Sequence, residues 1–152
     1  MVSLIGGFRV EVKMFTDKVR EFMLGCPYLS GTKLNINCLG IESMFCTIDN
    51  VAVEPVIKKY CDGGTLKQAR FILAIRDRYD ENVNENLKIA MLLEEIEDWI
   101  YEQNENGVLP ELDDEKRKCV GIEVVKTGHL YDTSMGSGRW QIEFRIVYRQ
   151  TV

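Results

Sequence analysis

A chain of 152 residues with 45% hydrophobic and 28% charged residues has the composition of one globular domain. Its formal net charge of −5 gives no overall attraction for phosphate backbones, which disfavours sequence-specific binding of nucleic acid. No run approaches the roughly 18 consecutive apolar residues that cross a bilayer, and the N-terminus lacks a secretory signal pattern. We therefore expect a single domain over residues 1–152, without a membrane span.

The cysteines indicate a reducing compartment, the cytoplasm. They are odd in number, widely spaced and mostly set among apolar neighbours, which favours packed thiols over a disulfide framework. The five positions are Cys26, Cys38, Cys46, Cys61 and Cys119.

The chain begins with a predicted amphipathic helix. Apolar residues recur at helical spacing between Val12 and Met23. Gly25, followed by Pro27, predicts that this helix ends near Leu24.

Three strands are predicted next. Alternating apolar and polar residues indicate a short strand over residues 33–38, a bent strand over 45–53, and a long strand that contains Phe71 and ends near residue 79. Residues 57–60 are too few to assign. The Asp62-Gly63-Gly64 sequence that follows them is typical of a turn.

The clearest helix lies between these strands and the C-terminal part of the chain. Asn82 with Glu85 resembles a capping box at its start, and Asn106-Gly107 is a stop signal at its end. One stripe of this helix is mainly apolar, and its members are Ile89, Leu92, Leu93, Ile96, Trp99, Ile100 and Gln103.

Two further strands complete the fold. Residues 120–131 and 139–149 alternate between apolar and polar, and residues 132–138 are predicted to form a polar hairpin loop between them. The sequence thus predicts an α+β fold, a mainly antiparallel sheet with two helices packed on one face in the order α-β-β-β-α-β-β.

Candidate catalytic groups are few. His129 is the one histidine and has no nucleophile motif near it, so a hydrogen-bonded strand histidine is the competing interpretation. Glu94, Glu95, Glu97 and Asp98 could act as paired carboxylates, or they could form a solvated helix face. The Gly63-Gly64 and Gly136/Gly138 pairs lack the frame of a phosphate-binding loop. We expect no catalytic residue, no cofactor and no metal site, and hence no enzyme.

A modest basic stretch has three interpretations. Its cations alternate with Tyr60, Phe71 and Tyr79, as in RNA-binding surfaces, but they also fit the polar face of an amphipathic strand, or a protein interface enriched in arginine. The cations are Lys58, Lys59, Lys67, Arg70, Arg76 and Arg78.

Five segments, in this order and spacing, resemble the tail terminator proteins of long-tailed phages and prophages of Gram-positive bacteria, often labelled minor capsid proteins. The resemblance covers roughly residues 30–150. The segments are 46–64 (CTIDNVAVEPVIKKYCDGG), 67–79 (KQARFILAIRDRY), 97–104 (EDWIYEQN), 107–112 (GVLPEL) and 140–148 (WQIEFRIVY).

The resemblance implies a structural virion protein of the tail or neck, assembled in the bacterial cytoplasm. Such a subunit forms a homo-oligomeric ring, typically hexameric, on the head-proximal end of the tail tube. Its implied partners are the tail tube protein and a neck or head-completion protein. The acidic balance is also compatible with passive contact with DNA in the lumen.

Two other classes stay open. One is a different neck or tail component, such as a head–tail connector or a tube protein. The other is a small enzyme or a nucleic-acid-binding accessory. Residues 134–138 and 40–45 have no counterpart in the resemblance, and we expect them to contact neighbouring subunits or the tube.

Overall fold

Two helices and six strands form the part of the chain that the computed structural model describes, residues 7–29, 34–36, 45–78, 83–112, 115–134 and 136–152. In chain order they are α1 (Gly7–Leu24), β1 (Leu34–Ile36), β2 (Phe45–Val51), β3 (Val56–Lys59), β4 (Thr65–Arg78), α2 (Val83–Glu105), β5 (Arg117–Ser134) and β6 (Ser137–Gln150), with a 3-10 turn at Pro27–Leu29. The predicted α+β class and order of elements are confirmed. The unassigned residues 57–60 contribute to one more strand, β3.

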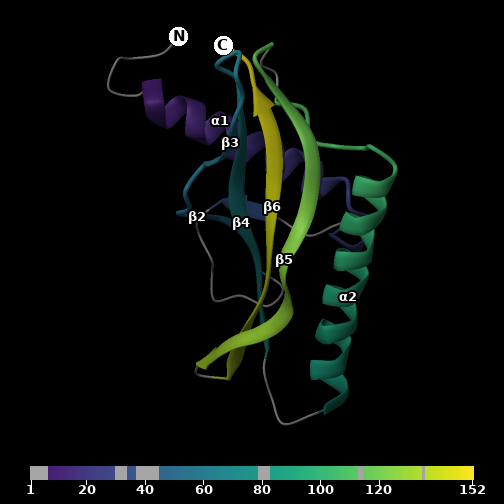
Figure 1. The fold of residues 1–152 in the computed structure, drawn as a ribbon. Helices are drawn as coiled ribbons and strands as arrows, with labels where there is room; N and C mark the ends of the chain where they lie inside the picture. The colour runs from purple at the N-terminus through teal and green to yellow at the C-terminus, as the bar shows by residue number, and fades with distance from the viewer. Residues whose placement is uncertain (1–6, 30–33, 37–44, 79–82, 113–114, 135) are drawn as a thin grey trace.

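The strands lie in the order β1-β2-β4-β6-β5, and β3 pairs with the N-terminal part of β4 (Figure 1). Only the pairing of β1 with β2 is parallel among the described strands. The mainly antiparallel sheet is therefore also as predicted, with β4 and β6 at its centre.

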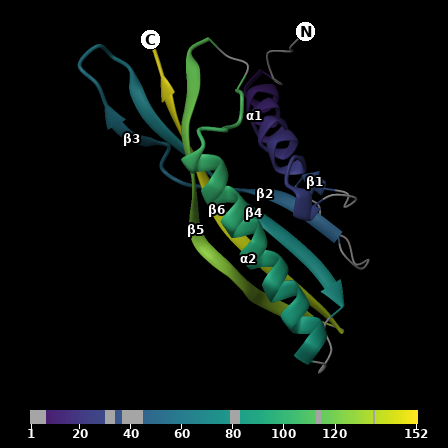
Figure 2. The same cartoon turned by 90° about the vertical axis from the view of Figure 1, so that its right-hand side faces the viewer.

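Strand alternation divides the sheet into two faces. Phe71, Leu73 and Ile75 of β4 lie directly opposite apolar residues of β6, and these side chains are buried in one core. Both helices cover this face, as Figure 2 shows. The helices also meet each other, since the rings of Phe22 and Trp99 have centroids 5.3 Å apart. The predicted two-layer arrangement is confirmed.

The C-terminal end of α2 follows the predicted stop. The N–H of Val108 donates to the carbonyl of Gln103 (2.9 Å) and that of Gly107 to Asn104 (3.2 Å), which is a Schellman motif. Gly107 has a φ of 69°, a conformation that favours glycine. At the other end, the predicted cap Asn82 lies outside the described residues.

The β5–β6 hairpin corrects one prediction. The loop expected over residues 132–138 is too long, because Thr133 pairs with Gly138 and Ser134 with Ser137, leaving two residues between the strands. Gly136, in this turn, has a φ of 78°. The stretch is polar because it lies at the exposed end of the hairpin, and polarity alone does not distinguish such a strand end from a loop.

Strand β5 forms one edge of the described sheet and is irregular. Its pairing with β6 shifts register four times, and β5 curves along its length (Figure 1). The shifts fall between Cys119 and Gly121, Val124 and Lys126, Lys126 and His129, and Leu130 and Asp132.

The cysteines agree with the expectation of packed thiols in part. Cys26, Cys46 and Cys119 are buried, whereas Cys61 is exposed; all four are free. Burial raises the pKa of the Cys119 thiol to about 11. Cys38 lies outside the described residues.

Candidate interaction surface

The face of the sheet opposite the helices is a layer of charged side chains. Even-numbered residues of β4 and odd-numbered residues of β6 point to this side, because their neighbours fill the core. We call this surface the arginine face and define it by Arg70, Arg76, Arg139, Arg145, Arg149, Lys118, Lys126, Asp49, Glu123 and Glu143.

Ion pairs fix three of the arginines across the strands. Arg145 Nη2 lies 2.9 Å from Glu123 Oε2, and Arg70 Nη1 lies 3.4 Å from Glu143 Oε2. These pairs join β6 to β5 and β4 to β6.

The third ion pair links two strands that are not neighbours in the sheet. Arg139 Nη2 on β6 lies 3.0 Å from Asp49 Oδ2 on β2, although β4 runs between these strands. Ala74 of β4, which points to the same face, is fully buried. A small side chain at this position leaves room for the arginine to extend across the strand.

Amide and hydroxyl groups also hold guanidinium groups of the arginine face. Gln68 Oε1 accepts from both Arg145 Nη1 (3.2 Å) and Arg70 Nε (3.4 Å). Arg76 Nη1 donates to Ser137 Oγ at 2.9 Å. These contacts restrain the guanidinium groups, and restrained side chains lose less entropy when they enter an interface.

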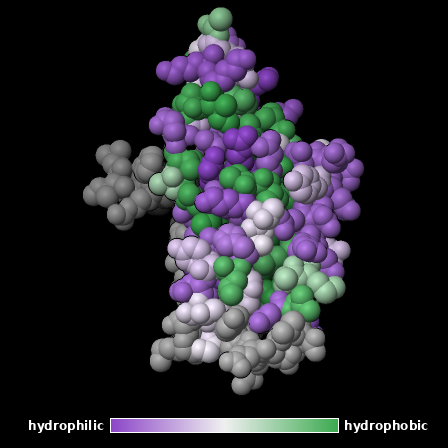
Figure 3. All heavy atoms as spheres, turned by 60° about the horizontal axis from the view of Figure 1, so that its bottom comes forward, coloured by the Kyte–Doolittle hydropathy of each residue, from purple (hydrophilic) through white to green (hydrophobic). Residues whose placement is uncertain are grey.

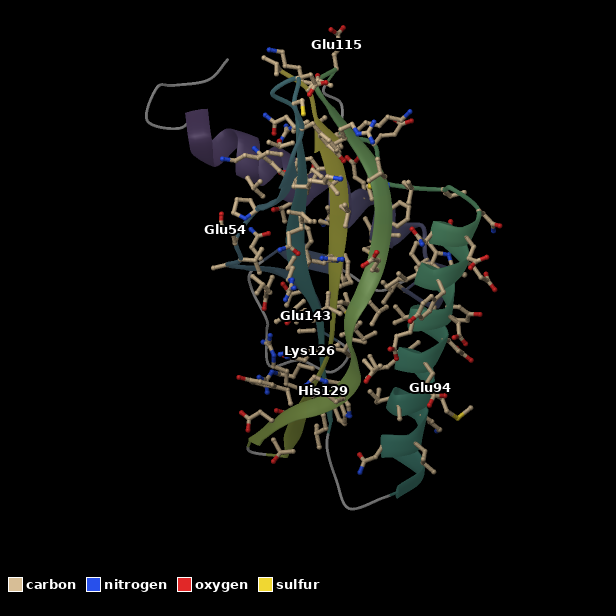
Figure 4. All side chains as sticks on the ribbon, in the orientation of Figure 1. Glu54, Glu94, Glu115, Lys126, His129 and Glu143 are labelled. Carbon is tan, nitrogen blue, oxygen red and sulfur yellow. The ribbon has the colours of Figure 1, made fainter. Side chains whose placement is uncertain are left out.

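The arginine face is still open to solvent. The side chains of Arg70 and Arg145 are 30% and 29% exposed, whereas that of Glu143 is only 8% exposed. In Figure 4, Glu143 and Lys126 lie on this open side. Among the residues whose side chains are described, cations outnumber carboxylates on the face, so the face is basic on an acidic chain.

The cations of the predicted basic stretch lie on different faces of the sheet. Arg70 and Arg76 belong to the arginine face, but Lys67 points to the helix side, where its Nζ donates to Gln150 Oε1 (3.0 Å). Lys58 and Lys59 are exposed on β3. The side chain of Arg78 lies outside the described residues. Phe71 is core, as the amphipathic-strand interpretation requires.

His129 lies on the exposed outer strand β5. Its Nδ1 lies 2.9 Å from the carbonyl oxygen of Thr127, so the Nδ1–H tautomer donates a hydrogen bond there. The residue borders a hollow of about 270 Å³ between α2 and β5. The hollow is lined by Asn86, Ala90, Leu93, Gly128, His129, Leu130 and Trp140.

The four carboxylates of α2 that the sequence singled out differ in their exposure to solvent. Glu94, Glu95 and Asp98 are exposed, and Figure 4 shows Glu94 pointing away from the sheet. Glu97 is half-buried, and the backbone N–H of Gly128 on β5 donates to its carboxylate. Burial raises the pKa of Glu97 above its ordinary value of 4.5, and the charges of Asp98 and Glu94 raise it further.

We expect the Glu97→Gln variant to be more stable than the parent protein at pH 7. The folded-state pKa of Glu97 is raised, so its ionisation opposes folding. That penalty is absent below pH 4.5 and grows as the pH rises through the folded-state pKa. Glutamine keeps an oxygen that can accept from Gly128.

Urea unfolding of parent and variant between pH 4 and 8 measures the effect. The two midpoints should coincide at the acidic end and separate as the pH rises. Glu95→Gln makes the same charge change on the solvent side of α2 and is the matched control. A separation that is constant at every pH would contradict the prediction.

The predicted turn at Asp62-Gly63-Gly64 is confirmed and connects β3 to β4. The N–H of Tyr60 donates to the carbonyl of Gly64 (2.8 Å), and Gly63 has a φ of 91°. A second hollow, of about 390 Å³, adjoins the turn. Lys58 Nζ and the guanidinium carbon of Arg149 lie 5.5 and 5.4 Å from the centroid of the Tyr60 ring.

Within the described residues, no three or more His, Cys, Asp or Glu side chains are arranged to bind a metal ion. Neither helix in the described part of the chain is long and apolar enough to span a membrane. Residues 40–44, singled out from the sequence, lie outside the described residues.

Sequence reasoning missed the ion-paired array of the arginine face. The alternation in residues 139–149 identified a polar face, but the partners of Arg139 and Arg145 are 90 and 22 residues away in sequence. Only strand register brings them together.

The sequence matches no model of a known protein family, and it matches no curated protein.

Proposed function

We propose that this chain is a structural subunit of a phage tail that forms a ring on the head-proximal end of the tail tube. The ring ends polymerisation of the tube and prepares the tail for joining to the head. The proposal rests on the resemblance of five ordered segments, which come from β2, β3, β4, α2 and β6 and the turns beside them.

The observation that carries the proposal is the arginine face. In the described residues the sheet has helices on one side only, and its other side is an ordered, partly exposed layer of arginines and carboxylates. Arginine is enriched in protein interfaces, and such a layer favours a binding role over a catalytic one.

A subunit with two different surfaces can end the growth of a tube. A tube grows by head-to-tail contacts that leave one unsatisfied surface at each end. A subunit that matches this surface, but presents a different opposite side, binds the end and stops growth. Closure into a ring lets several weak contacts act together.

The test is a tube-length assay. Tail tube subunits of the same virus are polymerised with and without the purified chain, and tube lengths are measured by electron microscopy. We expect shorter tubes with extra density at one end, and an unrelated protein of similar charge should change nothing. Unchanged lengths without end density would refute termination.

The main alternative is a head–tail connector or a tube protein, which shares the logic of ring formation. Long tubes formed by the purified chain alone would favour a tube protein, and binding to heads rather than tubes would favour a connector.

A further inference from the structure

The exposed side of α2 carries a stripe that combines acidic and large apolar residues. At helical spacing its members fall on one line along the helix, and all are exposed. We call it the α2 outer stripe and define it by Leu87, Met91, Glu94, Asp98, Tyr101, Glu102 and Glu105.

Three members of the stripe are large apolar side chains. Leu87, Met91 and Tyr101 are 52%, 59% and 59% exposed. Single exposed apolar residues are ordinary on a protein surface, but three on the one solvent-facing line of a helix are typical of a docking surface. Figure 3 shows hydrophilic residues over much of the outer side of α2, with hydrophobic ones near its N-terminal end.

The stripe and the arginine face lie on different sides of the molecule. The stripe faces solvent from the helix layer, whereas the arginine face is the opposite side of the sheet. One side is acidic and the other is basic. Copies could therefore meet stripe to face, and each copy would keep its second surface available for the next.

We propose that copies of this chain associate head to tail, with the α2 outer stripe of one copy on the arginine face of the next. This deepens the proposed function, because it names the contact between ring subunits. It rests on that function for closure into a ring, but not for the pairing itself. A symmetric pairing is disfavoured, because face on face or stripe on stripe would oppose like charges.

The mixture of charges on the arginine face also favours a protein partner over DNA. Asp49, Glu123 and Glu143 are interspersed among the arginines and would repel phosphates. A helix that presents both acidic and apolar side chains can contact the cations of the face and its apolar surface. Ile72, which is half-buried, supplies apolar surface there, whereas Val147 is buried.

Charge reversal tests the pairing. Glu94→Lys with Asp98→Lys makes the stripe basic, and Lys118→Glu with Lys126→Glu makes the edge of the arginine face acidic. All four residues are exposed, and the reversals leave the three ion pairs of the face intact. Circular dichroism verifies that each variant folds.

Sedimentation velocity over a range of protein and salt concentrations gives the result. We expect the parent chain to associate more weakly as salt rises, and each variant alone to associate at least tenfold more weakly, on the order expected for lost interface charges. An equal mixture of the two variants should associate again, because each then offers the surface that the other needs. A single chain that carries all four substitutions should also self-associate, because it offers both of the reversed surfaces.

Matched controls change the same charges elsewhere. Lys59→Glu alters an exposed lysine of β3 whose strand partner, Thr65, points to the helix side, and Glu111→Lys alters an exposed glutamate beyond α2. Both should associate like the parent.

Several outcomes would overturn the inference. A parent chain that stays monomeric at all concentrations would do so, as would variants that associate normally or a mixture that fails to recover. Binding of a 20-base-pair DNA duplex that is lost in the Lys118→Glu, Lys126→Glu variant, without self-association, would instead assign the face to nucleic acid. If tubes are capped normally by both variants, the proposed function stands and the pairing fails. If the pairing is found but tubes are not capped, the pairing stands and the proposed function fails.

Discussion

Replacing Phe144 with alanine should lower the free energy of unfolding by about 3–5 kcal/mol. Phe144 is fully buried in the middle of β6, and its ring stacks on Phe71 with centroids 5.7 Å apart. The substitution removes that contact and leaves a cavity that neighbouring strands cannot close. A typical domain is stable by only about 5–15 kcal/mol, so the loss is a large part of the total.

Urea unfolding followed by tryptophan fluorescence measures this loss. Tyr28→Ala removes a large aromatic side chain that is 44% exposed, and it should change stability by less than about 0.5 kcal/mol. A loss for Phe144→Ala as small as that of the control would mean that the core is not centred on the β4–β6 pair.

Replacing Gly128 with alanine should have the second largest effect, a loss of about 1–3 kcal/mol through overpacking. A Cβ at this position would lie 2.7 Å from Leu93 Cβ and 3.0 Å from Leu93 Cδ1. The Cβ of Leu93 is fixed by the backbone of α2, so relief requires the helix to move away from β5. That movement would also weaken the hydrogen bond from Gly128 N–H to Glu97.

Gly121→Ala is the matched control, since Gly121 also lies on β5 and faces α2. Its added Cβ would lie 3.4 Å from the Oδ1 of Asn104, an ordinary van der Waals distance. We expect a clearly smaller shift of the urea midpoint for this variant. Equal losses at the two glycines would show that the contact with Leu93 is not what limits position 128.

Periodicity was enough to predict the elements that are long and one-sided. The ends of α1 and α2 are set by local signals, Gly25 and Gly107, so their prediction did not depend on tertiary contacts. The alternation of β6 identified which side chains enter the core. Strand β3 escaped assignment because four residues are too few to show a period.

The candidate surface could be predicted less well, for a physical reason. Alternation assigns a residue to a face, but the partner on that face depends on strand order and register. Arg139 finds Asp49 only because β2, β4 and β6 are neighbours in the sheet. Glu97 looked like a member of a solvated helix face, and it is the irregular course of β5 that brings Gly128 to its carboxylate.

The two edges of the described sheet have a consequence for solution behaviour at high concentration. A neighbouring molecule that tried to extend the sheet would meet three residues of β1 on one side, and on the other an edge whose hydrogen-bonding groups change spacing four times. Neither of these two edges, nor the four-residue strand β3 beside β4, offers a long regular template in the described residues, which disfavours fibril growth by strand addition. A chain with such edges is less prone to aggregate through strand addition when it is concentrated.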